Sequence, residues 1–189
     1  VRSILTAGGR RVIGIFGELK FKKRVPLFLA ALRDAGLVPR AGLLIVGRMD
    51  EETRQILADP AIAPLSHAIP FSPPEKLPGL YAACDFVALP SLFEGMPNVL
   101  LEAMASGCVP IVSDAGAMGD IVGDGKTGFV FPAENRDAAA RAAARAFALD
   151  DKKLAAMSKR AKELIRKEFS PEKETDALME LLFGGGKEL

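Results

Sequence analysis

Short apolar runs alternate with longer amphipathic segments along most of the chain. Apolar runs of about four to eight residues between turn residues are typical of strands buried on both faces, and apolar spacings of three and four indicate helices. The pattern predicts strands at 11–16, 42–46, 65–71, 86–89, 109–112 and 128–131. It predicts helices between them, at 25–35, 52–58, 75–83, 97–107 and 118–122.

The connections between the predicted strands are long enough to contain a helix, so neighbouring strands are expected to run parallel. The sequence therefore predicts an α/β fold: a doubly wound, mostly parallel, Rossmann-like sheet of about six strands with helices on both faces. Two more helices, 135–148 and 151–169, follow without strands between them. Ser170 and Pro171 have the pattern of a helix start and predict a last helix that ends at Phe183.

Composition narrows the class of protein. The 189 residues are 49% hydrophobic and 26% charged, which is typical of a globular domain with a sizeable core. A net charge of +1, a single tyrosine and no tryptophan argue against nucleic acid as a partner. Cys84 and Cys108 lie in apolar segments and are expected to be buried, reduced thiols of a cytoplasmic protein. No apolar run has the length of a membrane span.

The segment 86–107 joins a strand, a loop and a helix. Pro90 ends the apolar run at 86–89, and Pro97 is expected at the first helical position, where its missing N–H leaves nothing unpaired. Gly107 ends the helix. The free N–H groups of a first helical turn and the helix dipole favour an anion, so this loop predicts a phosphate site.

Two carboxylates accompany that phosphate site. Glu94 lies in the loop, and Glu102 interrupts an otherwise apolar helix. A ligand with phosphate in the middle and hydroxyl-rich groups at both ends, such as a nucleotide sugar, would use the amides and both acids. Alternatively, Glu102 shares a solvated helix face with Asn98 and Ser106, and Glu94 is a solvated loop acid. Spacing alone leaves both interpretations open.

The segment 93–107 resembles the signature of two glutamates separated by seven residues that is found in retaining glycosyltransferases of GT-B architecture. These belong to the large glycosyltransferase family 4 group, which includes glycogen synthase and enzymes of polysaccharide biosynthesis. The flanking segments 85–91, 110–114 and 124–129 also match in order. The resemblance implies that residues 1–189 form the nucleotide-sugar (donor) binding domain and that the amino-terminal acceptor domain is absent. The last helix would then carry an apolar stripe without its partner domain: Leu178, Leu181 and Leu182.

The resemblance also implies roles for individual residues. Glu94 and Lys23 are the implied catalytic residues, with Glu94 accepting hydrogen bonds from the donor sugar and Lys23 on the diphosphate. Glu102 would accept from the ribose hydroxyls. The nucleobase region is assigned by position to Ile69, Pro70 and Phe71. The remaining implied donor contacts are Gly17, Arg24, Gly95, Met96, Pro97, Asn98 and Val99.

The turn after the first strand departs from the family pattern. Lys23 takes the position of the usual lysine, but Glu18 stands where arginine is usual and Arg24 where glycine is usual. An acid beside a diphosphate is unfavourable unless it turns away. Either Arg24 or Lys20 is expected to supply the second cation, or the donor binds less tightly.

The expected activity is transfer of a sugar from a nucleoside-diphosphate sugar to an acceptor with retention of configuration. The isolated chain is expected to be inactive, and the resemblance is compatible with association of the full-length protein with a membrane surface through the absent half. No cofactor or metal is expected, because the sequence has no Asp-x-Asp pair and no His or Cys cluster. Two alternatives remain: a non-catalytic nucleotide-binding module, which Glu18 favours, and a GT-B-fold nucleotide-sugar epimerase. The base could be that of UDP, GDP or ADP.

Overall fold

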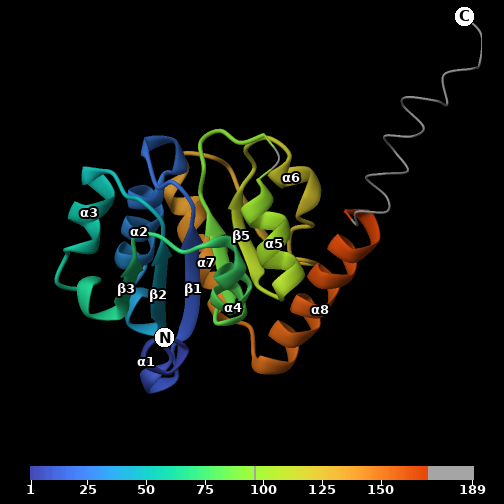
Figure 1. Ribbon diagram of the computed structural model, residues 1–189, viewed down its shortest axis with the longest axis horizontal. Coiled ribbons are helices and arrows are strands. Elements are labelled where there is room, and N and C mark those ends of the chain that lie inside the picture. Colours follow the sequence, from blue (N-terminus) through green and yellow to red (C-terminus); the bar gives the residue numbers. More distant parts are fainter. Residues whose placement is uncertain (96, 170–189) are drawn as a thin grey trace, which may run out of the picture.

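A parallel sheet of six strands forms the centre of the computed structural model, which describes residues 1–95 and 97–169 (Figure 1). The strand order is β3-β2-β1-β4-β5-β6, which is the doubly wound arrangement that the sequence predicts. Each predicted strand is present within a few residues of its expected bounds. The strands are β1 (Arg11–Phe16), β2 (Ala41–Val46), β3 (Ser66–Ile69), β4 (Phe86–Leu89), β5 (Val109–Ser113) and β6 (Phe129–Phe131).

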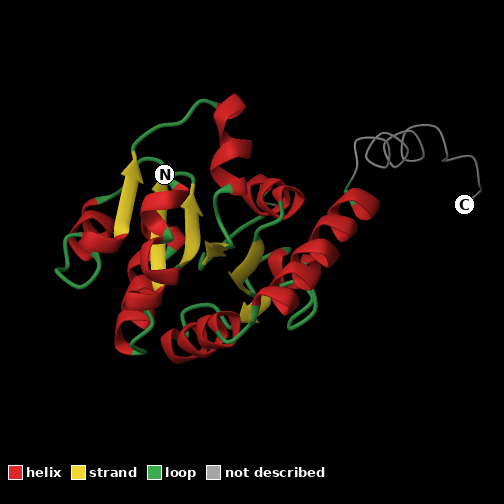
Figure 2. Cartoon of the chain, turned by 90° about the horizontal axis from the view of Figure 1, so that it is seen from below, coloured by secondary structure: helices red, strands yellow, loops and turns green. Residues whose placement is uncertain are grey.

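Helices cover both faces of this sheet (Figure 1 and Figure 2). One face packs against α2 and α7, with α3 beside α2, and the other packs against α4, α5 and α8. The α-helices are α1 (Arg2–Leu5), α2 (Val25–Asp34), α3 (Glu51–Leu57), α4 (Leu77–Ala82), α5 (Asn98–Ser106), α6 (Met118–Ile121), α7 (Arg136–Phe147) and α8 (Asp151–Glu168). Short 3₁₀ helices are η1 (Ala7–Gly9), η2 (Phe21–Lys23), η3 (Val38–Arg40), η4 (Ala63–Leu65) and η5 (Pro74–Lys76).

Burial explains why the strands read as continuous apolar runs. Every residue of β2 and of β4 is buried, because helices cover both faces of the parallel sheet. Cys84 and Cys108 are buried and free, as expected. Within the described part of the chain, no helix is long and apolar enough to cross a bilayer.

Side-chain caps define where three of the helices begin. Asp50 accepts from the N–H of Thr53 before α3, Asn135 caps α7 in the same way, and Asp150 caps α8. The small helix α1 was not predicted, because its place depends on a tertiary contact. Leu5 packs so closely over Gly42 that a Cβ there would lie 2.4 Å from the Leu5 carbonyl oxygen.

Helix α5 begins one residue later than the sequence predicts. Pro97 is the residue before α5 and not its first helical residue, because its ψ of 107° is extended while its carbonyl already accepts from the N–H of Leu100. Proline presets φ and leaves ψ free, so the sequence placed this helix start one residue early. The predicted last helix, with Leu178, Leu181 and Leu182, lies outside the described residues.

Candidate functional site

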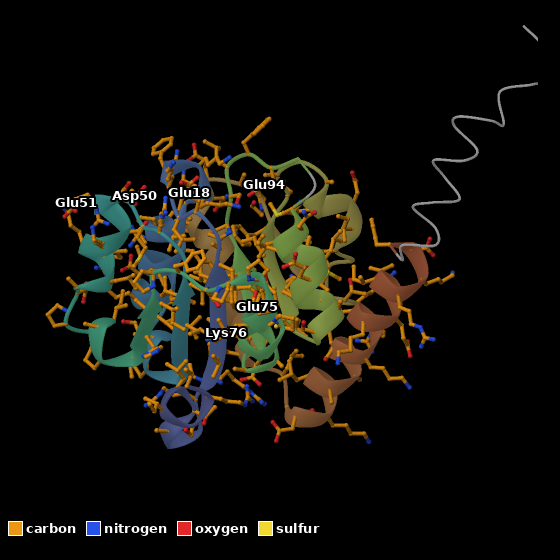
Figure 3. The ribbon with its side chains drawn as sticks, viewed as in Figure 1. Glu18, Asp50, Glu51, Glu75, Lys76 and Glu94 are labelled. Atoms are coloured by element: carbon orange, nitrogen blue, oxygen red, sulfur yellow. The ribbon has the colours of Figure 1, made fainter. Side chains whose placement is uncertain are left out.

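The carboxyl ends of the strands share one edge of the sheet, and the strand order reverses between β1 and β4. Doubly wound sheets bind their ligands in the crevice at this switch point. Glu18 follows β1 and Glu94 follows β4, and Figure 3 shows both at this edge. The residues predicted from the sequence are therefore brought to the edge where a ligand is expected.

A cavity of about 450 Å³ opens beside the ends of β1, β2 and β3, with α4 and α5 forming one wall. Five residues predicted from the sequence line it: Gly17, Pro70, Phe71, Val99 and Glu102. Glu18 lines it as well, together with residues that sequence reasoning did not select: Phe16, Val46, Gly47, Arg48, Ser72, Leu77 and Tyr81. Arg48 and Ser72 could have been found, since each follows the carboxyl end of a predicted strand.

Two glycines bring the ends of these strands together. Gly17 and Gly47 have φ of 112° and 132°, and a Cβ on Gly47 would lie 1.8 Å from the Gly17 carbonyl oxygen. The N–H of Gly17 donates to the Val46 carbonyl at 2.9 Å, and the N–H of Gly47 donates to that of Ile69 at 2.8 Å. Ile69 thus helps to build this edge through its backbone, while Pro70 and Phe71 after it face the cavity.

A hydrogen bond between two helices holds the carboxylate of the cavity. The Tyr81 hydroxyl, from α4, donates to Oε2 of Glu102, from α5, at 2.8 Å. Tyr81 is only 1% exposed, and its ring packs against that of Phe16 with centroids 4.4 Å apart. Burial raises the pKa of Tyr81, and the hydrogen bond to Glu102 raises it further, so the hydroxyl keeps its proton at neutral pH.

A second cluster surrounds Glu94, outside the lining of that cavity. Its Oε1 atom pairs with the Lys23 ammonium and accepts from the Ser91 hydroxyl at 3.1 Å. The side chains of Lys23 and Glu94 are 15% and 13% exposed. Ser91 is fixed in turn by Ser113, whose hydroxyl donates to the Ser91 carbonyl at 2.5 Å. The two implied catalytic residues are therefore in contact with each other.

The loop between Glu94 and α5 leaves backbone donors free. Among the described residues, the N–H groups of Asn98 and Val99 have no hydrogen-bond partner, and Pro97 provides no side-chain cap. Gly116, at a φ of 58°, lies under this loop, where a Cβ would be 1.7 Å from the Glu94 carbonyl oxygen. Gly95 accepts from the N–H of Ala117 at 3.4 Å. Met96 lies outside the described residues.

The cations near the cavity are partly engaged. Lys20 pairs with Glu18 at 2.8 Å, and the hydrogen bond from Lys20 is the main cause that lowers the pKa of Glu18. Arg24 pairs with Glu134 and stacks on Phe21, 3.9 Å from the ring centroid. Arg48 is the basic side chain among the described residues that lines the cavity.

A larger hollow, of about 740 Å³, lies between α2 and α3, and Arg24 is the one predicted site residue that lines it. Its charged side chains neutralise one another, as in the Arg33–Asp59 ion pair at 2.7 Å. The smaller cavity is the better candidate, because it lies at the switch point and contains the Glu102 carboxylate, one oxygen of which has no partner in the described part of the chain.

Within residues 1–95 and 97–169, no three or more His, Cys, Asp and Glu side chains are grouped so that they could hold a metal ion. The expectation that no metal is needed remains a prediction.

The fold is that of a GT-B glycosyltransferase domain, and the chain belongs to the glycosyl transferases group 1 family, which it matches over residues 2–164. The lipopolysaccharide core biosynthesis mannosyltransferase LpcC of Rhizobium leguminosarum bv. viciae is 31% identical over 180 residues. That match covers 90% of this chain and 50% of the Rhizobium protein. A D-inositol 3-phosphate glycosyltransferase of Nocardia farcinica is 30% identical over 136 residues, 66% of this chain and 30% of that protein.

Solved structures share the same fold. Anabaena HepE, solved in complex with UDP and glucose, superposes with a TM-score of 0.84 at 24% identity, over 97% of this chain and 51% of HepE. The carboxyl-terminal domain of the group 1 protein LpcC of Francisella tularensis superposes with a TM-score of 0.75 at 24% identity, covering 85% of this chain and 87% of that domain. The chain thus spans about half the length of the Rhizobium and Anabaena proteins and most of the isolated Francisella domain.

Proposed function

We propose that this chain is the donor-binding half of a retaining glycosyltransferase and that it binds a nucleoside-diphosphate sugar. Glu102 carries this proposal: its carboxylate lines the cavity at the switch point, and Oε1 has no partner among the described residues. A carboxylate accepts hydrogen bonds and does not bind phosphate, so it suits the hydroxyls of a ribose. The names of two Rhizobium mannosyltransferases favour a hexose as the transferred group, and the HepE complexes with UDP and UDP-glucose favour a nucleotide sugar as ligand.

The proposed arrangement spreads the donor along the edge of the sheet. The base and ribose would occupy the cavity, with Pro70 and Phe71 near the base and Glu102 on the ribose. The diphosphate would reach the free N–H groups of Asn98 and Val99 at the start of α5. The sugar would then lie beside Glu94, where its hydroxyls donate to the carboxylate.

In this arrangement the chain assists cleavage of the bond between the anomeric carbon and the diphosphate oxygen. The leaving diphosphate gains negative charge in the transition state, while the sugar becomes electron-poor. Fixed N–H groups and the Lys23 ammonium, aimed at the diphosphate, stabilise that charge more strongly than they stabilise the ground state. No metal is required in this scheme, and a chelator is expected to leave binding unchanged.

The first experiment measures nucleotide binding by residues 1–189. A nucleoside diphosphate at 100 times its Kd adds about 2.7 kcal/mol to the free energy of unfolding. At about 2 to 4 °C per kcal/mol, the melting temperature should rise by about 5 to 11 °C. UDP, GDP and ADP should differ, and the largest rise would identify the base.

Glu102→Ala tests the assignment of that carboxylate. Hydrogen bonds to a charged acceptor contribute about 1.5 to 3 kcal/mol each, so losing those from the ribose should erase most of the rise. Glu163→Ala is the matched control, because Glu163 is an exposed helical glutamate on α8. If no nucleoside diphosphate raises the melting temperature at millimolar concentration, or if Glu102→Ala binds like the parent, the donor-site assignment is wrong.

Transfer itself is tested on the natural protein that contains this chain. Release of free nucleoside diphosphate together with a new glycoside supports the transferase, and the anomeric configuration of that glycoside decides retention. The alternative of a nucleotide-binding module is favoured by Glu18 in the cavity wall. Tight binding of nucleotide sugars without turnover on any acceptor would support that module.

A further inference from the structure

The proposed contacts leave no role for Tyr81, a polar residue that lines the cavity. Its hydroxyl ends at the cavity lining, yet the residue is 1% exposed and belongs to the core of one face of the sheet. Sequence reasoning did not select it, because an isolated tyrosine in an apolar helix looks like a core residue. Its hydroxyl donates to Glu102.

The backbone and ring of Tyr81 are held from several sides. Its carbonyl accepts from the N–H of Cys84 at 2.8 Å and from the thiol of Cys108 at 3.1 Å. Phe16, at the end of β1, packs against its ring. The hydroxyl is therefore a donor in a fixed position, and its raised pKa keeps the proton on it.

Glu102 has no such support of its own. It lies on an exposed position of α5, and Tyr81 is its hydrogen-bond partner among the described residues. An unrestrained glutamate samples several rotamers, and ordering it on binding costs free energy. A carboxylate has about four acceptor sites, of which Tyr81 uses one. The remaining sites, including both on Oε1, stay available to a ligand.

We infer that Tyr81 is a positioning residue for donor binding: it holds Glu102 in the orientation in which Oε1 accepts from the ribose hydroxyls. This inference rests on the proposed function and deepens it. Tyr81 would not touch the ligand's reacting atoms, and its effect should be felt only by ligands that engage Glu102. A tyrosine that merely fills the core would influence all ligands of the cavity alike.

The test compares two ligands that differ only in the ribose hydroxyls. UDP and 2′,3′-dideoxy-UDP are titrated into residues 1–189 by calorimetry, and the guanine pair is used if GDP binds more tightly than UDP. The variants are Tyr81→Phe, which keeps the ring and removes the hydroxyl, Glu102→Ala and the double substitution. The measured quantity is the ratio of the two dissociation constants in each variant.

Tyr81→Phe should weaken binding of the ribonucleotide about tenfold, or about 1.4 kcal/mol, and change the dideoxy ligand by no more than about twofold. Glu102→Ala should abolish the preference for ribose, and Tyr81→Phe should have no further effect in that background. An equal loss for both ligands would assign Tyr81 a general structural role and overturn the inference. A Tyr81→Phe variant that binds both ligands as tightly as the parent would overturn it as well.

The failure of this inference is distinguishable from that of the proposed function. If the parent binds neither nucleotide, the proposed function and the inference are both wrong. If the parent prefers the ribonucleotide and Glu102→Ala loses that preference, the proposed function holds and only the role of Tyr81 is still under test. A second measurement tests the inference on the parent protein, in case the Tyr81→Phe variant folds poorly. Tyr81 is the single tyrosine of the chain, so fluorotyrosine labelling gives one fluorine NMR signal. That signal should move with UDP and much less with the dideoxy form; equal movement would contradict the inference.

Discussion

Two carboxylates at the same edge of the sheet differ in the partners that hold them. In the cavity, Tyr81 occupies one oxygen of Glu102, and the other oxygen has no partner among the described residues. In the loop after β4, one oxygen of Glu94 takes both the Lys23 ammonium and the Ser91 hydroxyl. Glu102 therefore has one neutral hydrogen-bond donor as its partner, whereas one oxygen of Glu94 is already engaged by a cation and a hydroxyl.

This difference predicts how the two ends of a donor would bind. A ribose can reach Glu102 without breaking a contact of the ligand-free chain, so this half of the site is preorganised. A sugar and diphosphate must instead share or displace the Lys23–Glu94 pair. We therefore expect the nucleoside end to supply most of the affinity, and the sugar end to change its contacts when the ligand arrives.

The largest expected effect concerns the Tyr81–Glu102 contact in the absence of ligand. The pKa of Tyr81 is raised in the folded chain above its ordinary value of about 10. Below pH 10 the tyrosine is neutral in both the folded and the unfolded chain, and its stabilising contact is complete. Above pH 10 the unfolded chain releases the proton while the folded chain keeps it, so unfolding becomes more favourable by up to about 1.4 kcal/mol per pH unit.

Denaturant unfolding of the parent and of Tyr81→Phe between pH 8 and 12 measures this loss. Lysines ionise in both proteins and cancel in the comparison. The parent should be the more stable at neutral pH, and its advantage should shrink as the pH rises above about 10. The ultraviolet absorbance of tyrosinate reports Tyr81 alone, since the chain has one tyrosine. Titration of that signal at the ordinary pKa in the folded chain would remove the basis for calling the cavity preorganised.

Much of the fold could be predicted because local patterns and tertiary packing agree. Parallel strands buried on both faces have apolar sequences, and Asp50, Asn135 and Asp150 are residue types that favour the N-cap position of the helices that follow them. The element that was missed is one whose formation depends on a tertiary contact. Helix α1 exists because Leu5 packs over Gly42, which no local signal reports.

The site divides in the same way. Glu94 and Glu102 could be selected because their spacing and the resemblance point to them. Arg48 could have been selected from its place after a predicted strand, whereas Tyr81 could not, because it acts across a helix pair. The ion-pair partners of Lys23 and Arg24 could not be predicted either, because an ion pair between distant loops has no signature in the sequence.

The second prediction concerns the Lys23–Glu94 ion pair. Glu94→Gln keeps the shape of the side chain and the acceptor for Ser91 but removes the counter-ion of Lys23. The Lys23 ammonium, whose side chain is 15% exposed, would then be unpaired and available to the diphosphate. The affinity for a nucleoside diphosphate should therefore rise about three- to tenfold. The extra affinity of the nucleotide sugar over the diphosphate should fall, because its acceptor carboxylate is gone.

Two variants separate this effect from a change in net charge. Glu163→Gln removes one negative charge on α8, where Glu163 pairs with Lys159, and should leave nucleotide binding unchanged. Lys23→Met combined with Glu94→Gln should cancel the gain, because no lysine is left to be released. A Glu94→Gln variant that binds the diphosphate no better than the parent would mean that the pair does not compete with the ligand.

The smallest expected effect comes from Glu18, the acid in the wall of the open cavity. Glu18 is exposed and paired with Lys20, which lowers its pKa, and like other glutamates it is charged at neutral pH. Its repulsion of a diphosphate is therefore weakened by solvent and by that lysine, and Glu18→Gln should tighten binding only about two- to fivefold at low salt. The gain should vanish near 1 M salt, where charges are screened within about 3 Å. Glu51→Gln, an exposed glutamate paired with Arg54 on α3, is the matched control and should have no effect. If Glu18→Gln weakens binding instead, Glu18 is a ligand contact, and the open half of the site recognises donors of hydrogen bonds at two carboxylates.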